Sequence, residues 1–359
     1  MLLADMGADV IKVESPSGDT LRQWPPHSGG FSENFASLNR NKRSIALDLK
    51  NPTDNAVAVR LIQDADVVVE NNRPGAMNRL GLGYERFAAG SPDLIYCSLS
   101  AFGQAGPRAS EGGFDLTVQA MAGIMSVTGE PGGEPVKCGI PISDFATGLY
   151  GAFAISSLVA RVCAGGSGGH IDVSMLGASL AVGALQTSEY FGSGRDPRAL
   201  GAAHPRNAPY QAFTASDGNF VLAAGNDRLW RSVCEVVGRM DLFEDPRFRS
   251  TMDRAGNQKE LAVILNGEFS RETVSGILEK LRRAGVPCSS INTYSQALDD
   301  PQVEFMGWVQ ELELPNGIKT RTFASPIRID GEAPGIYRRP PDLGEHGESI
   351  LGTLSAAAE

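Results

Sequence analysis

The residue whose position most favours a chemical role is Asp144. A run typical of a β-strand, from Val136 to Ser143, ends directly before it, and a helix rich in small residues is predicted from Phe145 to about Val162. A carboxylate at such a junction lies at a helix N-terminus, where unpaired N–H groups and the helix macrodipole favour negative charge. The segment alone admits two interpretations: an ordinary N-cap, for which Asp is a preferred residue, or a carboxylate that takes part in catalysis.

The composition is that of a globular protein large enough for two domains. The chain has 359 residues, of which 42% are hydrophobic and 21% charged. Its formal net charge of −10 argues against a general nucleic-acid or anionic-membrane binder, because both need a positive field. No run approaches the roughly 18 apolar residues that a membrane span needs. We therefore expect neither a nucleic-acid nor a membrane partner.

Cysteine and histidine usage indicates no metal site and a reducing compartment. The five cysteines are scattered without a C-x-x-C pair, and none of the four histidines forms a ligand-like pair. The N-terminus lacks a basic region and carries Asp5, so it does not resemble a signal peptide, and we expect a cytoplasmic location. The GxGxxG and P-loop fingerprints are missing, so we expect no tightly bound nucleotide cofactor.

Strands and helices alternate along the first part of the chain, which is typical of a parallel sheet covered by helices. The loops that follow the strands are polar or rich in Gly and Pro, and open α/β sheets place ligands there. Strands are predicted at Val10–Glu14, Ser44–Leu49, Asp66–Glu70 and Leu94–Leu99, and helices at Thr53–Asp64 and Gly83–Ala89.

The first residues look like the middle of a βαβ unit. Met1 to Asp9 reads as the last turns of a helix closing at Gly7, with neither an N-cap nor a strand before it. We therefore expect that the chain starts late and that a first strand is missing.

The second half predicts a smaller α+β domain. Asp217-Gly218 between two alternating runs is a hairpin signal. Helices are predicted at Asp227–Gly238, Asn257–Phe269 and Thr273–Ala284, and short strands at His170–Ser174, Val309–Leu314 and Ile318–Phe323. The predicted organisation is a large domain at 1–195, a linker at 196–209, a small domain at 210–300, and a segment at 301–359 that returns to the large domain.

Several motifs, in order along nearly the whole chain, resemble one family. They are Gly7–Glu14, Leu38–Ile45, Val69–Gly75, Leu80–Tyr84, Gly112–Asp115, Gln119-Ala120 and Thr128-Gly129. The chain resembles the class III CoA-transferases of the formyl-CoA and crotonobetainyl-CoA transferase type. The resemblance implies a Rossmann-like parallel sheet in the large domain and an interlocked homodimer. Members of the family begin earlier, with a further strand and a CoA-contacting loop, which agrees with the expected late start.

The resemblance also implies a reaction, and Asp144 matches the family's nucleophile. Its carboxylate would attack an acyl-CoA thioester to form a mixed anhydride and free CoA thiolate. The thiolate would then form an aspartyl–CoA thioester and release the first acid, and an incoming acid would reverse the sequence. Covalent catalysis of this kind divides one difficult exchange into easier steps. Coenzyme A enters as substrate, and acyl-CoA and small carboxylic acids are the expected partners.

The family's CoA contacts map to three segments of this chain. We favour Arg73 and Arg79 for the phosphates, because guanidinium forks suit phosphate oxygens, although a single surface Arg is more often a solvated charge. The basic cluster Arg40, Lys42 and Arg43 either serves the phosphates or pairs with acidic neighbours. Ser15 occupies a position that can hold a CoA-binding Arg. The full set of CoA-binding candidates is Leu47, Lys50, Asn71, Asn72, Arg73, Arg79, Gly112, Gly113, Phe114 and Asp115.

Two other functions compete with CoA transfer. A 2-methylacyl-CoA racemase of the same fold would need a base on each face of the carbon, and its His would fall at Phe114, which cannot carry a proton. A non-catalytic acyl-CoA or nucleotide binder would not depend on Asp144. The context of Asp144 favours the transferase.

Two segments of the predicted small domain indicate which carboxylic acids exchange CoA. Tyr210–Phe213 and Ala224–Asn226 resemble the subgroup that takes CoA from succinyl-CoA and passes it to another dicarboxylate. A second carboxylate in the substrate needs a cationic partner, and His204 and Arg206 in the preceding loop are candidates. The alternative for both is an ordinary exposed loop residue. The predicted substrate-binding residues are His204, Arg206, Gly225 and Asn226.

Overall fold

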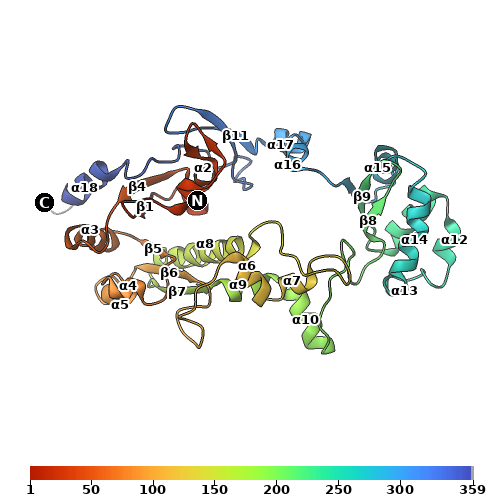
Figure 1. The fold of residues 1–359 in the computed structure, drawn as a ribbon, viewed down its shortest axis with the longest axis horizontal. Helices are drawn as coiled ribbons and strands as arrows, with labels where there is room; N and C mark the ends of the chain where they lie inside the picture. Colours follow the sequence, from red (N-terminus) through yellow and green to blue (C-terminus); the bar gives the residue numbers. More distant parts are fainter. Residues whose placement is uncertain (357–359) are drawn as a thin grey trace. The chain divides into compact units, whose positions relative to one another are not determined.

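The chain folds into two compact units (Figure 1). The computed structural model describes residues 1–356, with side chains as far as Leu354. The large unit comprises Met1–Ala122, Gly139–Ala184 and the segment from Leu298 onward, and the small unit comprises Gly123–Cys138 and Leu185–Ala297. Each unit has a hydrophobic core of its own.

Parallel pairing of the predicted strands is confirmed, but they form two sheets in the large unit. In one sheet β1 (Val10–Glu14) pairs with β4 (Lys42–Ala46). In the other, the order is β5 (Val67–Glu70), β6 (Ile95–Ser100) and β7 (Gly169–Ser174). The unbroken β-branched run of β5 predicts a buried strand, and this prediction is wrong, because β5 lies at the edge of its sheet and Val69 is exposed. The central strand, β6, is the buried one.

Helices with clear local signals flank these strands. Helix α3 (Pro52–Gln63) begins after Asn51, whose side chain accepts hydrogen bonds from the Thr53 and Asp54 N–H groups. Pro52 occupies its first turn, where a missing N–H costs nothing. The remaining elements of this unit are α1 (Leu2–Asp5), η1 (Thr20–Gln23), β2 (His27–Ser28), β3 (Phe31–Ser32), α2 (Glu33–Asn39), α4 (Ala76–Arg79), α5 (Tyr84–Ala88), α6 (Asp115–Met121), α9 (Met175–Val182), α17 (Pro301–Met306), β11 (Val309–Glu313), β12 (Lys319–Phe323) and α18 (Gly347–Ala356).

Helix α8 (Ile142–Cys163) is the long helix that carries Asp144. It packs on β6 through Ile155, which contacts Ile95 and Cys97, and Gly151 allows a close approach, since a Cβ there would lie 3.2 Å from Leu99. The strand expected at Val136–Ser143 is wrong. That stretch has no partner strand, and helix α8 begins at Ile142, directly after Pro141.

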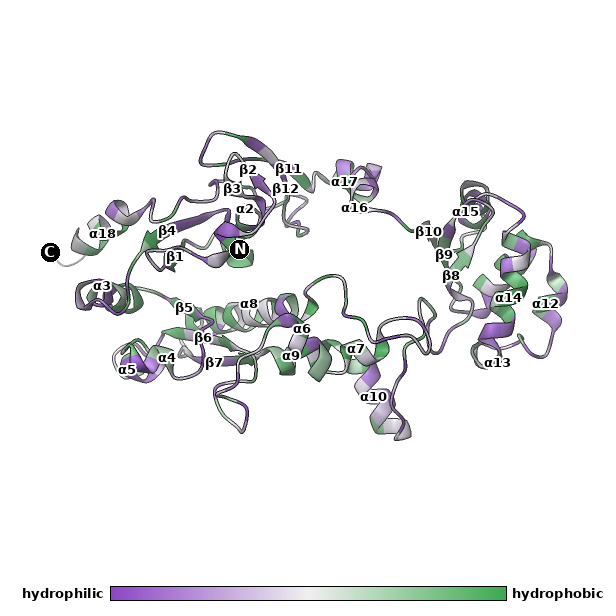
Figure 2. Cartoon of the chain, in the orientation of Figure 1, coloured by the Kyte–Doolittle hydropathy of each residue, from purple (hydrophilic) through white to green (hydrophobic). Residues whose placement is uncertain are grey.

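The α8 helix is also notably apolar, as Figure 2 shows by its green and white residues. Among residues 1–356, it is the single helix whose length and composition would allow it to cross a membrane. A core helix of a water-soluble fold meets the same criterion. The expected absence of a membrane partner therefore stays a prediction.

A buried ion pair joins distant parts of the large unit. Arg40 is 1% exposed, and its Nη2 lies 2.7 Å from Asp5 Oδ2. Its Nη1 donates to the backbone oxygens of Ser37 and Phe323. Asn41, in the left-handed region at φ 61°, donates to Asp5 Oδ1. The cluster thus ties α1 to the start of β4 and to the end of β12, so Arg40 pairs with an acidic neighbour rather than presenting its charge to a ligand.

The small unit contains the predicted hairpin and a third strand. Strands β8 (Tyr210–Thr214) and β9 (Asn219–Ala223) are antiparallel, and β10 (Cys288–Ser290) pairs with the other edge of β9. Helices α11 (Asp227–Val237), α14 (Gln258–Phe269) and α15 (Val274–Arg283) cover this sheet and confirm the three helices predicted here. The other helices in or bordering this unit are α7 (Ile124–Val127), α10 (Ala184–Ser193), α12 (Met240–Glu244), α13 (Thr251–Gly256) and α16 (Tyr294–Leu298).

Replacing Arg40 by Leu should lower the free energy of unfolding by about 3–5 kcal/mol, because Asp5 would be left as an unpaired buried charge. Urea denaturation measures this loss. Arg43→Leu is the matched control, since Arg43 pairs with the exposed Asp9, and its cost should stay below about 1 kcal/mol. Equal losses in the two variants would contradict the role given to Arg40.

Candidate active site

Asp144 lies in the first turn of α8 and presents an unpaired carboxylate. The helix begins at Ile142 and Pro141 is its N-cap residue, so the interpretation of Asp144 as an N-cap is wrong. Its side chain is exposed, and among the described residues no hydrogen bond or ion pair engages its carboxylate. First-turn N–H groups point toward the end of the helix where this side chain lies. A free carboxylate at this position is available for reaction.

Asp115, the first residue of α6, supplies the cap that α8 itself lacks. Its Oδ1 accepts a hydrogen bond of 3.0 Å from the Ser143 N–H, and its Oδ2 accepts one of 2.7 Å from Gln119 Nε2. Oδ1 therefore holds the start of α8 against α6, and Oδ2 is engaged within α6 itself. Ser143 is buried and accepts a further hydrogen bond from Ser179 of α9. Three helices thus fix the backbone beside Asp144.

The electrostatic surroundings of Asp144 disfavour its charged form. Loss of hydration among neighbouring groups raises the pKa of Asp144 above its usual value, and the negative charge of Asp115 raises it further. The side chain is still open to solvent on one side, so the effect is partial. A carboxylate that water stabilises less fully is a better nucleophile toward a carbonyl carbon.

The segment after β5 and the loop after β6 bring basic and glycine residues together. A Cβ at Gly112 would lie 3.2 Å from Arg73 Nη2, and a Cβ at Gly113 would lie 2.7 Å from that of Ala101. Close packing therefore requires a glycine at Gly113, whereas the movable end of Arg73 could give way to a methyl group at Gly112. Neither Arg73 nor Arg79 forms an ion pair among the residues that the structure describes. Asn71 donates to the Leu99 carbonyl and links the ends of β5 and β6.

A polar cavity of about 390 Å³ opens beside Arg73, near the ends of β5 and β6. Its wall includes Glu70, Ser98, Gln104 and His170, which sequence reasoning did not single out. Their positions in the sequence carry no motif, and only the pairing of β5, β6 and β7 gathers them. Gln104 Nε2 is a buried donor with no partner among the described residues.

Other predicted CoA-binding residues are placed less directly. The Leu47 side chain is buried in the hydrophobic core, and its backbone N–H donates to the Glu14 carbonyl, so neither group is open to a ligand. Lys50 and Asn72 are exposed, and Phe114 is 82% exposed. The structure records no contact of Leu47 or Lys50 with Arg73 or Asp144 in residues 1–356. The assignment of all these residues to CoA stays a prediction.

The predicted substrate-binding residues gather within the small unit. His204 Nδ1 accepts hydrogen bonds from the Arg206 and Asn207 N–H groups, both 3.1 Å long. The neutral ring therefore carries its proton on Nε2. Partial burial lowers the pKa of His204, and the Arg206 charge lowers it further. A Cβ at Gly225 would lie 3.9 Å from the Asn207 side chain, which brings the two predicted segments together.

Arg206 and Asn226 already have partners. Arg206 Nη1 lies 2.9 Å from Glu189 Oε2 in an exposed ion pair. Asn226 caps α11 by accepting a hydrogen bond from the Leu229 N–H. The His204 Nε2–H, in contrast, has no hydrogen-bond partner among the described residues.

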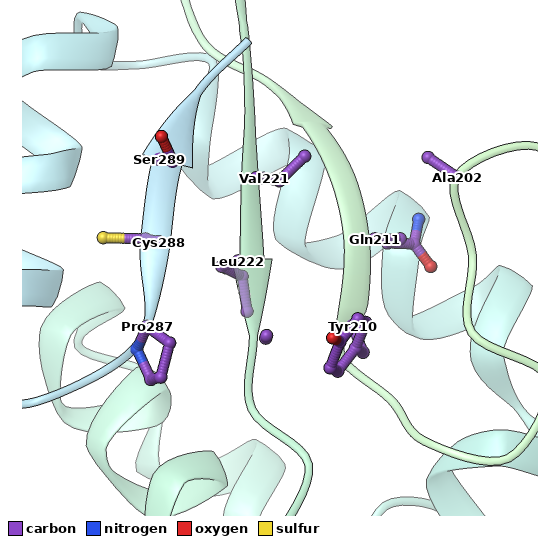
Figure 3. A pocket seen from close by; sticks show the side chains of 9 residues that line it. Ala202, Tyr210, Gln211, Val221, Leu222, Pro287, Cys288 and Ser289 are labelled. Carbon is purple, nitrogen blue, oxygen red and sulfur yellow. The ribbon is translucent and has the colours of Figure 1, made fainter. Parts of the chain in front are cut away.

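An open cavity of about 370 Å³ lies over the small sheet. Figure 3 shows the strand residues that line it, with Gln211 extending toward Ala202 on the neighbouring loop. The lining residues are Ala202, Tyr210, Gln211, Val221, Leu222, Ala223, Pro287, Cys288 and Ser289. Tyr210 also contacts the His204 ring at 5.0 Å between centroids.

The comparison with known proteins decides the family. Residues 1–347 match the model of CoA-transferase family III. The chain belongs to this family. The succinate–glutarate CoA-transferase of Agrobacterium fabrum is 39% identical over 98% of this chain and 90% of its own length. The human succinyl-CoA:glutarate CoA-transferase is 36% identical over 98% of this chain and 81% of its own length.

A solved structure agrees with this assignment. A CAIB/BAIF family protein from Brucella suis has a TM-score of 0.85 and 38% identity, and the match covers 98% of this chain and 93% of that one. The predicted mixed α/β fold with parallel sheets is thereby confirmed. The protein is a class III CoA-transferase.

Among the described residues, no group of three or more His, Cys, Asp or Glu side chains is placed to bind a metal ion.

Gly113→Ala should lower the free energy of unfolding by about 1–3 kcal/mol, because its new methyl group would overlap Ala101. Gly112→Ala is the matched control, since its methyl group meets only the movable end of Arg73, and we expect a smaller loss. Urea denaturation of both variants checks the prediction. A larger loss in Gly112→Ala would contradict the described packing.

Proposed function

We propose that this CoA-transferase moves CoA from succinyl-CoA to another dicarboxylic acid, with Asp144 as the covalent nucleophile. The observation that carries the proposal is the unpaired Asp144 carboxylate in the first turn of α8, held in place through Asp115 and Ser143. The names of the relatives from Agrobacterium fabrum and Homo sapiens, with succinate or succinyl-CoA and glutarate, support dicarboxylic acids as substrates.

The reaction balances without water or a further reagent. An Asp144 oxygen attacks the thioester carbon, the C–S bond breaks, and a mixed anhydride and CoA thiolate form. The thiolate then attacks the aspartyl carbonyl carbon, the anhydride C–O bond breaks, and the first acid leaves as a carboxylate. The second acid attacks the aspartyl–CoA thioester, and the same two steps in reverse give its CoA ester and restore the Asp144 carboxylate. Each step keeps an activated acyl group, so the free energy of the thioester is retained.

Groups near Asp144 suit these steps. In the first turn of α8, the N–H groups of Ile142, Ser143 and Phe145 already donate to Ile140, Asp115 and Pro141. The Asp144 N–H is therefore the candidate donor for the oxyanion that forms in each addition, and one such donor contributes about 3–4 kcal/mol in other enzymes. Open space surrounds a Cβ built at Gly148, one turn beyond Asp144, so the chain leaves room for a thioester on that side of the helix.

The proposed CoA site lies in the large unit. The unpaired guanidinium groups of Arg73 and Arg79 suit the phosphates, and the polar cavity beside Arg73 offers a recess for the nucleotide part. Gly112 and Gly113 have no side chains, so the backbone there can approach the nucleotide part of CoA closely. Asn71, Asn72, Leu47 and Lys50 complete the proposed set, with Leu47 acting through its backbone carbonyl.

The residues proposed to bind the distal carboxylate of the acid lie in the small unit. His204, with its proton on Nε2, is a neutral donor for the distal carboxylate of the substrate. Arg206 shares its charge with Glu189, so it contributes less unless that pair opens. The apolar wall of the cavity beside Tyr210 offers room for the carbon chain.

The interlocked homodimer is part of the proposal. The α8 helix exposes Phe145, Leu149 and Phe153. Apolar side chains gathered on a surface in this way are typical of protein contacts. A second copy of the chain, as the family resemblance implies, would cover them.

A racemase is not favoured. Its proton transfers require an ionisable group where this chain has Phe114, and the relatives that match nearly the whole chain are named CoA-transferases.

Asp144→Asn should abolish the covalent adduct. Wild-type protein mixed with succinyl-CoA should gain a CoA-sized mass that hydroxylamine removes, and the variant should gain none, as intact-protein mass spectrometry would show.

The raised pKa of Asp144 makes its ionisation unfavourable in the folded state, so the free energy of unfolding falls as pH rises through that pKa. The variant lacks this penalty and should be at least as stable as the wild type at pH 7.

The same samples separate the alternatives. An equal adduct on Asp144→Asn would overturn the assignment of the nucleophile. Exchange of the α-proton of a 2-methylacyl-CoA in heavy water, with no adduct on wild type, would identify a racemase. Tight CoA binding with neither signal would identify a non-catalytic binder.

Asp115→Asn should shift the pH dependence of adduct formation. Asn keeps an oxygen that accepts from the Ser143 N–H but removes the charge that raises the pKa of Asp144. The Asp144 pKa should fall, and the acidic limb of the rate profile should move to lower pH. Rates of adduct formation measured from about pH 4 to 8 would show this, and an unmoved limb or a shift to higher pH would contradict it.

A further inference from the structure

Arg254 is a buried cation whose whole hydrogen-bonding capacity is used. It lies in α13 of the small unit and is 0% exposed. Nε donates to the Ala208 carbonyl at 2.7 Å, and Nη1 donates to the carbonyls of Phe248 and Arg249 at 3.0 and 3.2 Å. Nη2 donates to Asp227 Oδ1 at 2.7 Å and to Thr251 Oγ1 at 3.1 Å. All five donors of the guanidinium group are thus paired.

Two of these partners border the two segments that are proposed to bind the acid substrate. Ala208 ends the loop that starts at His204, which we call the His204 loop (residues 204–208). Asp227 directly follows Asn226 and begins α11. One guanidinium group therefore links the end of the His204 loop to the turn at Gly225-Asn226. Arg254 is far from both segments in the sequence, so the sequence alone does not predict this link.

A second side chain holds the other end of the loop. Gln258, at the start of α14, donates to the His204 carbonyl at 3.0 Å and more weakly to that of Asn207 at 3.4 Å. The loop is thus held at both ends by Gln258 and Arg254, which are four residues apart in the sequence. Between these ends, the Arg206 and Asn207 N–H groups converge on His204 Nδ1 and fix the direction of its Nε2–H.

Charge pairing alone does not explain this arrangement. The Asp227 side chain is 62% exposed, so its ion pair with Arg254 contributes little to stability. Four of the five hydrogen bonds go to uncharged oxygens instead. Trp230 lies beside Arg254, with 5.7 Å between the guanidinium carbon and the ring, a contact that suits a cation. What only a planar, five-donor group provides is one geometry for Ala208 and Asp227 together.

We propose that Arg254 is a positioning residue for acid recognition, which fixes the His204 loop against the Gly225-Asn226 turn. This proposal rests on the proposed function, because it assumes that these segments contact the acid. Arg254 itself does not touch the substrate. It acts through the direction of His204 Nε2–H and through the start of α11.

The test compares three variants of the full-length protein. Arg254→Lys keeps the charge but cannot make all five hydrogen bonds, and Gln258→Ala frees the other end of the loop. Arg239→Lys is the matched control, because Arg239 bridges Asp241 and Glu268 in the same unit without touching the loop. Kinetics would be measured with succinyl-CoA and glutarate, and amide hydrogen exchange would be followed over residues 201–209 and 224–228.

We expect Arg254→Lys and Gln258→Ala to raise the KM for glutarate about tenfold or more, with a smaller change in kcat and an unchanged Kd for free CoA. Amides of the His204 loop should exchange faster in both variants and not in Arg239→Lys. An unchanged KM and unchanged loop exchange in Arg254→Lys would overturn the proposal. So would equal effects of Arg239→Lys, which would indicate general destabilisation.

The outcome also separates this proposal from the proposed function. If wild-type protein forms no CoA adduct and transfers no CoA to any dicarboxylic acid, the proposed function fails. Hydrogen exchange in the ligand-free variants then still shows whether Arg254 fixes the His204 loop. If the wild type is active and Arg254→Lys alters kcat alone, acid recognition does not depend on Arg254 and the further proposal fails.

Discussion

The site depends on one hydrogen bond, from the Ser143 N–H to Asp115 Oδ1. Helix α8 begins after Pro141 without a side-chain cap of its own, so an acceptor from α6 takes that place. The same carboxylate binds Gln119 with its second oxygen, which leaves Asp144 as the free acid of the pair. Asp115 therefore acts in two ways: it fixes the turn that carries Asp144, and its charge adds to the partial loss of hydration that raises the pKa of Asp144.

In each of the two units, a buried arginine side chain holds together backbone groups from distant segments. In the large unit, the buried Arg40–Asp5 pair collects backbone groups from segments that are distant in sequence. In the small unit, Arg254 does so for the loops around His204. Each guanidinium group is nearly or fully buried and donates to both a carboxylate and several carbonyl oxygens, which a compact ammonium group would serve less well. Irregular segments lack the regular hydrogen bonds of helices and strands, and buried arginines supply substitutes for them.

Much of the fold follows from local sequence signals. The strands at Val10–Glu14 and Tyr210–Thr214 and the helix capped by Asn51 form as their patterns predict, because alternation and capping are local properties. The expected strand before Ile142 was wrong, since its β-branched residues find no partner strand. The sequence predicts that Asp144 lies at the start of a helix, but it does not predict the capping by Asp115, the buried position of Gln104, or the contacts of Gln258 and Arg254. Those depend on contacts between distant segments, and neither composition nor periodicity encodes them.

The closeness of Asp115 and Asp144 has a consequence for how the reaction would be driven. Two negative carboxylates repel each other in the resting protein, and acylation converts one of them into an uncharged ester-like group. If Asp144 carries the acyl group as proposed, forming the intermediate relieves that repulsion. The empty enzyme would be the electrostatically frustrated state and the loaded enzyme the relaxed one. The protein would then bias its own covalent equilibrium toward loading, with no contact to the substrate needed for that bias.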